Sequence, residues 1–489
     1  MHRTSPPGSP SEPRSPTPPD AGPAADSFAG LGLPPATLDN LARLGYLAMT
    51  PIQAAALPLA LAGHDLIAQA KTGSGKTAAF ALALLNRLDP RLMAEPGVMA
   101  LQALVLCPTR ELADQVTQEV RRLARADDHV KVLTLCGGSP IRPQIESLAH
   151  GAHIVVGTPG RILDHLERGS LALASLTTLV LDEADRMLDM GFVDDIKAVA
   201  KQCPKQRQTL LFSATWPDGV AALAAAFLRD PKEVRLVERH AANKIRQIFY
   251  EVREDERLHA VAQLLDHHRP ASTIAFCNTK QQCRDLFDVL RAQGYVALEL
   301  HGDLDQRERD QVLVRFANGS ASVLVATDIA ARGLDITQLA AVINVDITPE
   351  PATHTHRIGR TGRVDAEGWA FSLASLDEMG RVGQLEHTHG FVAAWQPLAS
   401  LTPAGGEPLR PPMATLQILG GRKEKIRAGD VLGALTKDMG FAAADVGKIS
   451  VNEYATYVAV RRALAPAVLR KLNAGKVKGR SVKVRMLEG

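Results

Sequence analysis

Short, continuously apolar runs recur along this chain with helical segments between them, and they limit its fold more than any other feature. Four such runs lie between residues 60 and 235, within the sequences ALVLCPT, HIVVGTP, TLVLDEA and TLLFSAT. Continuous Val, Leu and Ile, rather than apolar residues alternating with polar ones, is typical of strands buried on both faces of a parallel sheet. Segments such as RELADQVTQEVRRLA between them have helical spacing. The sequence therefore predicts an α/β domain over residues 28–236.

The same pattern restarts near residue 245. The runs there are STIAFCNT, YVALELHG, SVLVATDIA, AVINVDI and WAFSLAS, and they predict a second α/β domain over residues 244–399. Residues 400–412 are rich in Pro and Gly, which is typical of a linker. Residues 413–489 show strand, helix, strand, strand, helix and strand patterns, so we expect a small α+β domain of β-α-β-β-α-β order.

Composition excludes several classes of protein. With 46% hydrophobic and 22% charged residues, the chain has the composition of a globular protein, and no apolar run reaches the length of a membrane span. Residues 1–27 hold eight Pro and five Ser and are expected to be a disordered tail. The five cysteines form no C-x-x-C pair. We therefore expect a cytoplasmic protein with no disulfide framework and no membrane or zinc site.

Charge is unevenly distributed along the chain. Residues 413–489 contain 15 Lys and Arg against six Asp and Glu, a net charge of +9, whereas the whole chain carries only +3. Everything before residue 413 is therefore acidic, at −6. Such asymmetry predicts that the C-terminal segment binds nucleic acid or another anionic surface.

A phosphate-binding loop is predicted in the segment AQAKTGSGKTAAF, which follows the apolar run DLIAQA and precedes a helix. Backbone N–H groups of such a loop cradle phosphate, while Lys76 reaches the terminal phosphates of a nucleotide and Thr77 reaches Mg²⁺. Ala70 stands where the usual pattern begins with Gly. The predicted nucleotide-binding residues are Ala70, Lys71, Thr72, Gly73, Ser74, Gly75, Lys76 and Thr77.

Acidic residues follow the apolar strand in TLVLDEADRML. Asp182 is placed to hold Mg²⁺, partly through water, and Glu183 to orient or deprotonate the water that attacks the γ-phosphate. The alternative is that Asp182 and Asp185 only favour the start of the next helix. The phosphate loop upstream favours the catalytic interpretation.

Taken together, the motifs resemble the DEAD-box RNA helicases, a family named for the four residues Asp182 to Asp185. In order, the chain contains GYLAMTPIQ, AKTGSGKT, PTREL, GG, TPGR, DEAD, SAT, HGD, TDIAARGLDI and HRIGRTGR. The resemblance covers residues 28 to about 395. It implies two RecA-like parallel-sheet domains in tandem, with ATP and RNA bound across their cleft.

The resemblance assigns roles around the nucleotide. Phe28 would stack on adenine, although a core aromatic is the simpler alternative, and Gln53 would bind the edge of the base. Asp335 would contact the ribose, and Arg360 and Arg363 would reach the phosphates as arginine fingers. Ser213, Ala214 and Thr215, together with His356, would couple the nucleotide site to strand opening; a simple hydroxyl turn is the alternative for the first three.

An RNA track is also implied. It would run over Pro108, Thr109, Arg110, Gly138, Thr158 and Arg161 in the first domain and Thr327 in the second. Small residues, hydroxyls and arginines in loops suit a sugar-phosphate backbone and hold a strand without reading its sequence. Each of these residues taken singly could be an ordinary turn or helix cap.

The basic C-terminal segment resembles the RNA-binding domain of DbpA-type helicases through GDVLGALT, YVAVR and KVKGRSVKVRML. This implies an RNA-recognition-motif-like (RRM-like) fold that binds large-subunit ribosomal RNA. The segment departs from the usual aromatic pattern of that motif, because only Tyr457 occupies an aromatic position. We therefore expect RNA contacts from Tyr457 and, above all, from the basic residues Arg470, Lys471, Lys476, Lys478 and Arg480. The alternative is a small basic fold that stabilises the core or binds any RNA.

The sequence thus predicts an ATP-dependent RNA helicase that uses ATP and Mg²⁺ and locally unwinds RNA duplexes. The C-terminal domain would direct it, as a monomer, to a hairpin of large-subunit ribosomal RNA in pre-ribosomal particles. One alternative is a nucleotide-switched RNA clamp or a general RNA chaperone. A DNA translocase is a weaker alternative.

Overall fold

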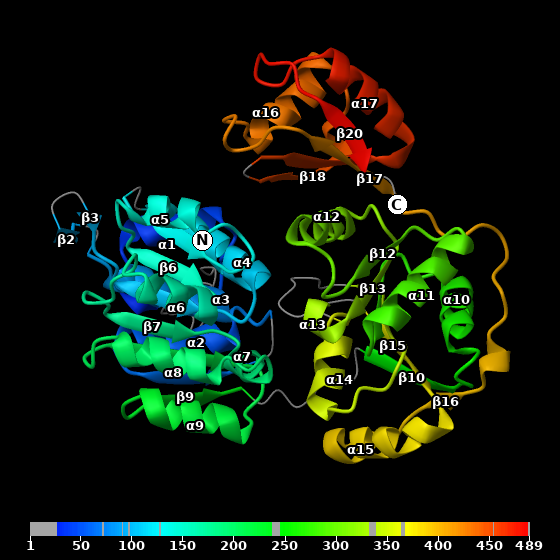
Figure 1. Ribbon diagram of the computed structural model, residues 1–489, viewed down its shortest axis with the longest axis horizontal. Helices are drawn as coiled ribbons and strands as arrows, with labels where there is room; N and C mark the ends of the chain where they lie inside the picture. The colour runs from blue at the N-terminus through cyan, green and yellow to red at the C-terminus, as the bar shows by residue number, and fades with distance from the viewer. Residues whose placement is uncertain are drawn as a thin grey trace, which may run out of the picture. The chain divides into compact units, whose positions relative to one another are not determined.

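The computed structural model describes residues 27–70, 73–89, 91–95, 98–126, 129–236, 245–331, 339–362, 367–452 and 454–487. Two compact units divide the chain, Met1–Val237 and Glu238–Gly489, and each contains one large parallel sheet (Figure 1). No helix within these stretches combines the length and apolar composition needed to cross a membrane.

The first unit is built on a seven-stranded sheet of order β5-β6-β4-β7-β8-β1-β9, in which all paired strands are parallel. The four apolar runs form β4, β6, β7 and β8, and every residue of these strands is buried. The predicted parallel sheet is confirmed. Its strands are β1 Leu66–Gln69, β4 Ala103–Leu106, β5 Val132–Leu135, β6 Ile154–Gly157, β7 Thr178–Leu181, β8 Gln208–Ser213 and β9 Lys232–Arg235.

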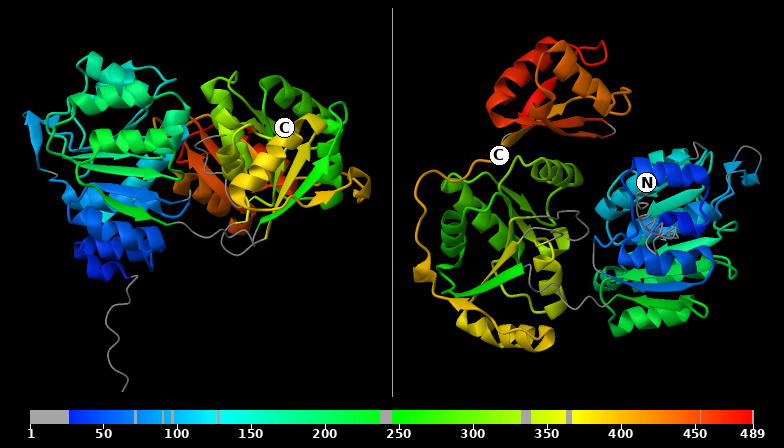
Figure 2. Two further views of the ribbon diagram at one scale, coloured as in Figure 1. Left: turned by 90° about the horizontal axis from the view of Figure 1, so that it is seen from below. Right: turned by 180° about the vertical axis from the view of Figure 1, so that it is seen from behind.

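Helices cover both faces of this sheet (Figure 2). Because successive residues of a strand point to opposite faces, Val105 packs in a core with α1 to α4, whereas Leu104 and Leu106 pack in another with α5 to α9. The helices are α1 Pro35–Arg43, α2 Pro51–Leu61, α3 Lys76–Arg87, α4 Arg110–Leu123, α5 Arg142–Leu148, α6 Pro159–Glu167, α7 Ala184–Asp189, α8 Val193–Gln202 and α9 Asp218–Phe227. A 3-10 turn, η1 Phe28–Leu31, precedes them, and the hairpin strands β2 Met93–Glu95 and β3 Val98–Met99 follow α3.

The second unit contains a seven-stranded parallel sheet of order β12-β13-β11-β14-β15-β10-β16. The five apolar runs of this part of the sequence form β11 to β15, which confirms the second α/β domain. Its strands are β10 Ile245–Glu251, β11 Thr273–Cys277, β12 Ala297–Leu300, β13 Val323–Thr327, β14 Ala341–Asn344, β15 Gly368–Ala374 and β16 Trp395–Gln396.

Three apolar clusters pack against this sheet. One includes α10 and α11, another includes α12 and α13, and a smaller one joins β10 and β15 to α15. The helices are α10 Arg257–His268, α11 Lys280–Ala292, α12 Gln306–Ala317, α13 Asp328–Ala331, α14 Pro351–Ile358 and α15 Met379–His389.

A four-stranded antiparallel sheet of order β18-β19-β17-β20 completes the second unit. Its elements are β17 Met413–Ile418, α16 Ala428–Gly433, β18 Val446–Val451, β19 Thr456–Arg461, α17 Ala465–Ala474 and β20 Val484–Leu487. This is the predicted β-α-β-β-α-β order. Leu416 and Val458 on one face of the sheet pack under both helices, so this C-terminal domain has a core of its own.

The other face of the small sheet contacts the loop that follows α12. Asn318 Nδ2 donates to Thr415 Oγ1 at 3.1 Å, and Ser320 Oγ lies 2.7 Å from the same hydroxyl. Thr415 and Gln417 of β17 are 0% and 1% exposed. The central part of this face is therefore covered within the second unit, whereas Arg485 on the edge strand β20, which bonds Gln417, stays exposed.

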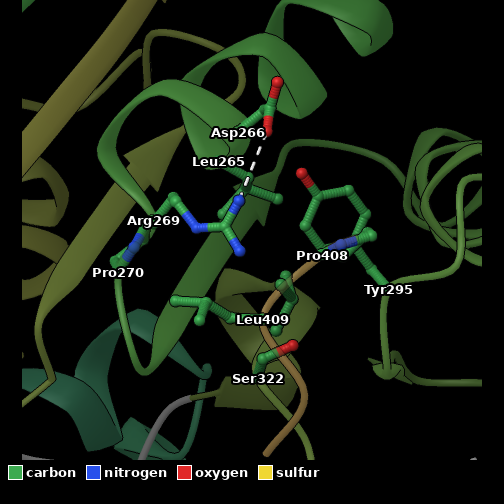
Figure 3. Close-up of a pocket in the computed structure, with 9 residues that line it drawn as sticks. Leu265, Asp266, Arg269, Pro270, Tyr295, Ser322, Pro408 and Leu409 are labelled. Carbon is green, nitrogen blue, oxygen red and sulfur yellow. Dashed lines mark ion pairs between the residues drawn. The ribbon is translucent and has the colours of Figure 1, made fainter. Parts of the chain in front are cut away.

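Residues 398–412, which we call the strap, connect the two domains of the second unit. Leu398 and Leu401 pack against the core beside α10, and His267 Nδ1 accepts from Thr402 N at 3.1 Å. Arg269 donates to Gly405 O and Glu407 O at 3.1 and 2.8 Å. Figure 3 shows Arg269 and its ion-pair partner Asp266 beside Pro408 and Leu409 of the strap. The segment predicted as a linker is thus held against α10.

Candidate nucleotide and RNA sites

The predicted phosphate loop lies between β1 and α3. Gly73 and Gly75 have φ values of 76° and 95°, in the left-handed region that favours glycine. A Cβ atom at Gly75 would lie only 2.6 Å from Gln53 Nε2, so the loop passes too close to α2 for a side chain. Lys76 is 6% exposed, and its Nζ donates to Ala70 O at 2.6 Å. The strand, loop and helix expected around a phosphate are present, although Lys71 and Thr72 lie outside the described residues.

Hydroxyl groups beside this loop have unused hydrogen-bonding capacity. Ser74 Oγ and Thr50 Oγ1 are buried and have no hydrogen-bond partner among the described residues. Buried hydroxyls without partners are costly, so a polar ligand that bonded them would stabilise the site. Thr77, in the first turn of α3, adds the hydroxyl expected to reach Mg²⁺. These groups fit a nucleotide phosphate with its metal.

The amide of Gln53 joins α2 to the phosphate loop. Thr50 N donates to Gln53 Oε1 at 2.9 Å, and Gln53 Nε2 donates to Gly75 O at 3.1 Å. Both ends of the amide are therefore engaged within the chain. The contact of Gln53 with adenine stays a prediction, and it requires these bonds to be shared or exchanged.

Phe28 belongs to the apolar core of the first unit. It is 4% exposed and meets the ring of Tyr46 edge to face, with centroids 6.4 Å apart. The Tyr46 hydroxyl donates to Glu119 Oε1 on α4. Stacking of Phe28 on adenine stays a prediction. No role was predicted for Tyr46, which holds Phe28 in place.

Asp182 and Glu183 lie at the carboxyl end of β7. Asp182 is 2% exposed, and its burial, followed by the charge of Glu183, raises its pKa to about 7, while Lys76 opposes this shift. A buried carboxyl that is destabilised as an anion is stabilised by a nearby cation. Asp182 therefore fits the predicted role of holding Mg²⁺.

Glu183 is held by a partner that the motifs did not predict. Its Oε2 lies 2.7 Å from Arg186 Nη1 in a buried ion pair. Glu183 also has a φ of 53°, which is uncommon for a residue with a side chain. The ion pair and the backbone turn fix the position of the carboxylate. Because residues three apart on a helix are neighbours, the spacing from Glu183 to Arg186 could have indicated this pair.

Asp185 binds the Ser-Ala-Thr segment that follows β8. Its Oδ2 accepts from Ala214 N at 3.2 Å and from Thr215 N and Oγ1 at 2.7 and 2.8 Å. In return, Asp185 N donates to Ser213 Oγ at 3.3 Å. The two motifs are therefore joined directly within the first unit. Coupling of this link to RNA opening stays a prediction.

The predicted RNA-track residues of the first unit converge at the carboxyl ends of β4, β5 and β6. A Cβ at Gly138 would lie 2.5 Å from Arg110 Nη1, so this guanidinium rests on the glycine. Arg161 Nη2 donates to Ser139 O at 3.0 Å. Gly137 N donates to Thr158 Oγ1 at 3.4 Å, and Pro108 and Thr109 lead into α4, which Thr109 caps. The Nη1 atoms of Arg110 and Arg161 are buried and have no hydrogen-bond partner among the described residues. Such free donors suit a phosphate ligand.

Motif residues of the second unit gather around Arg357. Its guanidinium bonds both Asp328 oxygens at 2.7 and 2.6 Å and Asn278 Oδ1 at 2.9 Å. Arg357 is 1% exposed, so it fixes the loops after β11 and β13 rather than contacting a ligand. Thr327 ends β13, His356 lies in the last turn of α14, and Arg360 follows that helix. Asp335 and Arg363 lie outside the described residues.

Tyr457 requires a correction. The sequence placed it in an exposed aromatic position for RNA, but it is 3% exposed, and its hydroxyl accepts from Gln417 Nε2 at 3.2 Å. Burial and the charge of Asp310 raise the pKa of Tyr457, whereas the charge of Arg307 lowers it. Asp310 and Arg307 both lie on α12. Tyr457 therefore lies on the covered face of the small sheet and is not available to stack on a base in this arrangement.

Basic residues of the C-terminal domain gather instead on three neighbouring loops, 419–427, 454–455 and 476–483, which we call the three-loop face. Lys478 Nζ donates to Lys425 O at 2.6 Å. Lys423 Nζ donates to the Tyr454 hydroxyl at 2.8 Å and lies 4.7 Å from its ring centroid. Tyr454 is 61% exposed. Three of the predicted RNA contacts, Lys476, Lys478 and Arg480, lie on this face.

The other two predicted contacts lie on α17. Arg470 and Lys471 are exposed there, but Lys471 Nζ is engaged with Met439 O at 2.7 Å and with the ring of Phe441. Lys423, Lys425 and Tyr454 were not predicted from the sequence, because they are distant in sequence from the basic C-terminal stretch. The basic run RKEKIR at residues 422–427 was the available signal in the sequence.

Known families match three segments of the chain. Residues 50–223 match the DEAD/DEAH box helicase family, residues 256–365 the helicase conserved C-terminal domain, and residues 415–486 the DbpA RNA binding domain. The ATP-dependent RNA helicase DbpA of Escherichia coli (strain K12) is 52% identical over 457 residues, which are 93% of this chain and 98% of that protein. This chain belongs to the DEAD-box ATP-dependent RNA helicases.

Further comparisons place this DEAD-box helicase within its family. The RNA helicase CshA of Listeria monocytogenes is 46% identical over 74% of this chain and 68% of that protein. The structure of S. cerevisiae Dbp5 bound to RNA and ADP BeF3 aligns with a TM-score of 0.69 and 32% identity, over 76% of this chain and 96% of that one. This helicase is therefore of the DbpA type, with two RecA-like domains and an RNA-binding domain, and it uses ATP.

Proposed function

We propose that this DEAD-box helicase opens short RNA duplexes beside a hairpin of large-subunit ribosomal RNA and acts in ribosome assembly. The observation that carries the proposal is the three-loop face. The central strands β17 and β19 have buried side chains on the face of the sheet that meets the loop after α12, whereas Lys423 remains exposed beside Tyr454, and Lys478 and Arg480 are exposed on loop 476–483. A basic surface with an exposed aromatic side chain suits an RNA hairpin.

In the proposed hydrolysis step, Lys76 leaves Ala70 O and binds the β- and γ-phosphates of ATP, while Ser74 supplies its unused hydroxyl. Thr77 and Asp182 would hold Mg²⁺, which neutralises charge that develops on the transferred phosphoryl group. Glu183, fixed by its ion pair with Arg186, takes the proton of the attacking water. Arg360 and Arg363 of the second unit would complete the site as arginine fingers when the units close.

Coupling between ATP and RNA would pass through the bonds that join Asp185 to Ser213 and Thr215. Because the Asp185 carboxylate fixes the Ser-Ala-Thr segment, a shift of the Asp-Glu-Ala-Asp turn on hydrolysis would move that segment as well. His356 would connect this turn to the second unit. ATP binding and RNA binding would then favour the same closed state, which is reciprocal coupling.

The RNA track of the first unit would hold one strand by its phosphates. Among the described residues, Arg110 and Arg161 each have a buried Nη1 atom without a hydrogen-bond partner, and the hydroxyls of Thr109 and Thr158 lie in the same loops. Such contacts position a strand without selecting its sequence. The Dbp5 structure, which resembles the two RecA-like domains, holds RNA together with ADP BeF3 and supports this placement.

The test is ATP hydrolysis by the whole protein with a panel of RNAs at equal concentration. The proposal predicts that hairpins of large-subunit ribosomal RNA stimulate hydrolysis at much lower concentration than unrelated hairpins of equal length. Equal stimulation of ATP hydrolysis by both sets of hairpins would show that the protein has no preference for ribosomal RNA. Turnover-dependent release of a short strand annealed beside the hairpin tests unwinding, and release that occurs equally with a non-hydrolysable analogue would favour a clamp.

A further inference from the structure

Four arginines meet where the strap joins the C-terminal domain to the second RecA-like domain. They are Arg291 in the last turn of α11, Arg315 in the last turn of α12, Arg410 in the strap and Arg462 directly after β19. We call them the junction arginines. None of them belongs to a helicase motif, and none lies on the three-loop face.

Hydrogen bonds join two of these residues, Arg315 and Arg462, through one loop, residues 318–320. Ser320 N donates to Arg315 O at 3.0 Å, and Arg462 Nη2 donates to Ser320 O at 3.1 Å. Arg462 Nε donates to Pro411 O at 2.7 Å, which brings in the strap beside Arg410. Pro408 lies near Gly294, just beyond α11, since a Cβ there would be 3.8 Å from its ring. Four separate segments that each carry one of the junction arginines therefore meet around this loop and the strap.

Acidic partners are scarce there. No ion pair among the described residues involves Arg291, Arg315 or Arg462. Arg410 Nη2 lies 3.5 Å from Glu407, and both side chains are largely exposed, at 69% and 82%. Such a pair contributes little attraction in water.

The arginines also act unfavourably on one another. Burial, followed by the charges of Arg462 and Arg291, lowers the pKa of Arg315. Burial and the charge of Arg410 lower the pKa of Arg462 in the same way. In addition, Nε and Nη2 of Arg315 are buried and have no acceptor among the described residues. An unsatisfied buried cation among like charges destabilises the fold, unless an anion binds it.

We propose that the junction arginines bind a phosphate group, supplied by the RNA strand that leaves the hairpin held on the three-loop face. Guanidinium forks match phosphate oxygens, and Arg291 and Arg410 are exposed, so a strand can approach from solvent. Contacts made to phosphate alone do not depend on the base sequence. The inference rests on the proposed RNA-binding function, which it extends with a second contact.

The test uses the full protein and two RNAs, the hairpin alone and the same hairpin with single-stranded flanks. The double variant Arg291→Gln/Arg410→Gln removes the two exposed charges without disturbing the buried bonds of Arg462. The control, Arg253→Gln/Arg381→Gln, removes the same number of charges from the second unit outside the junction. Arg253 and Arg381 are 75% and 46% exposed, and each pairs with a neighbouring carboxylate.

We expect the double variant to bind the flanked RNA more weakly than the control does. The slope of log binding constant against log salt concentration should become shallower by about 0.7 for each single-strand phosphate that the variant no longer neutralises. Binding of the hairpin without flanks should not change. Equal slopes for variant and control with flanked RNA would overturn the inference, as would an equal weakening with both RNAs.

Inorganic phosphate distinguishes the two sources of the group. At constant ionic strength, competition by phosphate with flanked RNA in the unchanged protein, but not in the double variant, would show that free phosphate also binds. A flank-dependent slope without such competition would restrict the site to phosphodiesters. If the proposed preference for ribosomal RNA is wrong, the unchanged protein will bind ribosomal and unrelated hairpins equally. The effect of the flanks on the salt dependence can still be measured in that case.

Discussion

At the scale of single residues, buried charges set the chemistry of the nucleotide site. Burial and the charge of Glu183 raise the pKa of Asp182 to about 7, and Glu183 is fixed by its ion pair with Arg186. The motif positions were predictable from sequence, since the phosphate loop and the Asp-Glu-Ala-Asp turn each follow a strand. The pairing of Gln53 with Gly75 was not, because that contact depends on how α2 lies against the loop.

The first prediction concerns the general base. Glu183→Gln should lower the rate of RNA-stimulated ATP hydrolysis by about 10² to 10⁴-fold, because the amide cannot accept the proton of the attacking water. Binding of ATP and of RNA should persist, since neither contact needs the charge of Glu183. Steady-state hydrolysis with fluorescence titrations of both ligands checks this result. A normal rate of ATP hydrolysis in this variant would show that Glu183 is not the general base.

The second prediction concerns the RNA track. Gly138→Ala places a Cβ 2.5 Å from Arg110 Nη1 and should displace this guanidinium, so RNA stimulation of ATP hydrolysis should need much more RNA. Gly169→Ala is the matched control, because its φ of 66° is close to the 70° of Gly138 but nothing lies within 4 Å of the added atom. Both variants should be destabilised by about 1 kcal/mol from backbone strain. An RNA response that was equal in the two variants would contradict this role for Arg110.

At the scale of elements, continuous apolar runs were sufficient to predict both large sheets, because strands buried on two faces leave no other pattern. The strap was not predictable as an ordered segment. Its anchoring depends on Arg269 and His267, which bond backbone oxygen and nitrogen atoms of strap residues that are 135 or more positions away. A Pro and Gly composition carries no sign of such bonds.

The third prediction concerns acid sensitivity of the second unit. Burial lowers the pKa of His268, stacked on Phe371, to about 4 and that of His354 to about 3. Unfolded histidine takes up a proton near pH 6.5. The unfolded chain therefore binds more protons between these values, so the free energy of unfolding should fall as the pH falls from about 6.5 to about 4.

Urea unfolding followed by circular dichroism at several pH values measures this dependence. His268→Phe keeps an aromatic ring against Phe371 but cannot bind a proton, so its stability should fall less steeply with acid. Parallel pH dependence in the variant and the unchanged protein would show that His268 is not buried in its neutral form.

At the scale of the whole molecule, a two-domain helicase core is combined with a basic C-terminal RNA-binding domain, and we propose that this domain selects the RNA. The prediction of a basic, folded C-terminal domain was correct, but its exposed surface was placed partly on the wrong residue, Tyr457. Thr415 and Asn318 are in contact although they are 97 positions apart in the sequence. Contacts between such distant positions leave no local sequence pattern, so the covered face of the sheet could not be predicted.

The central claim is that the three-loop face selects the RNA. Removal of three positive charges there, in Lys423→Gln/Lys425→Gln/Lys478→Gln, should abolish the preference for a ribosomal hairpin over an unrelated one and leave the maximal hydrolysis rate at saturating RNA unchanged. The matched control is Lys197→Gln/Lys201→Gln/Lys205→Gln, which removes three positive charges from the surface of the first unit.

The decisive measurement is therefore the RNA concentration that gives half-maximal ATP hydrolysis, determined with both hairpins for the unchanged protein and both triple variants. Our account predicts a large difference between the hairpins in the unchanged protein and the control, and none in the three-loop variant. A preference that survived in the three-loop variant, or that disappeared equally in the control, would contradict it.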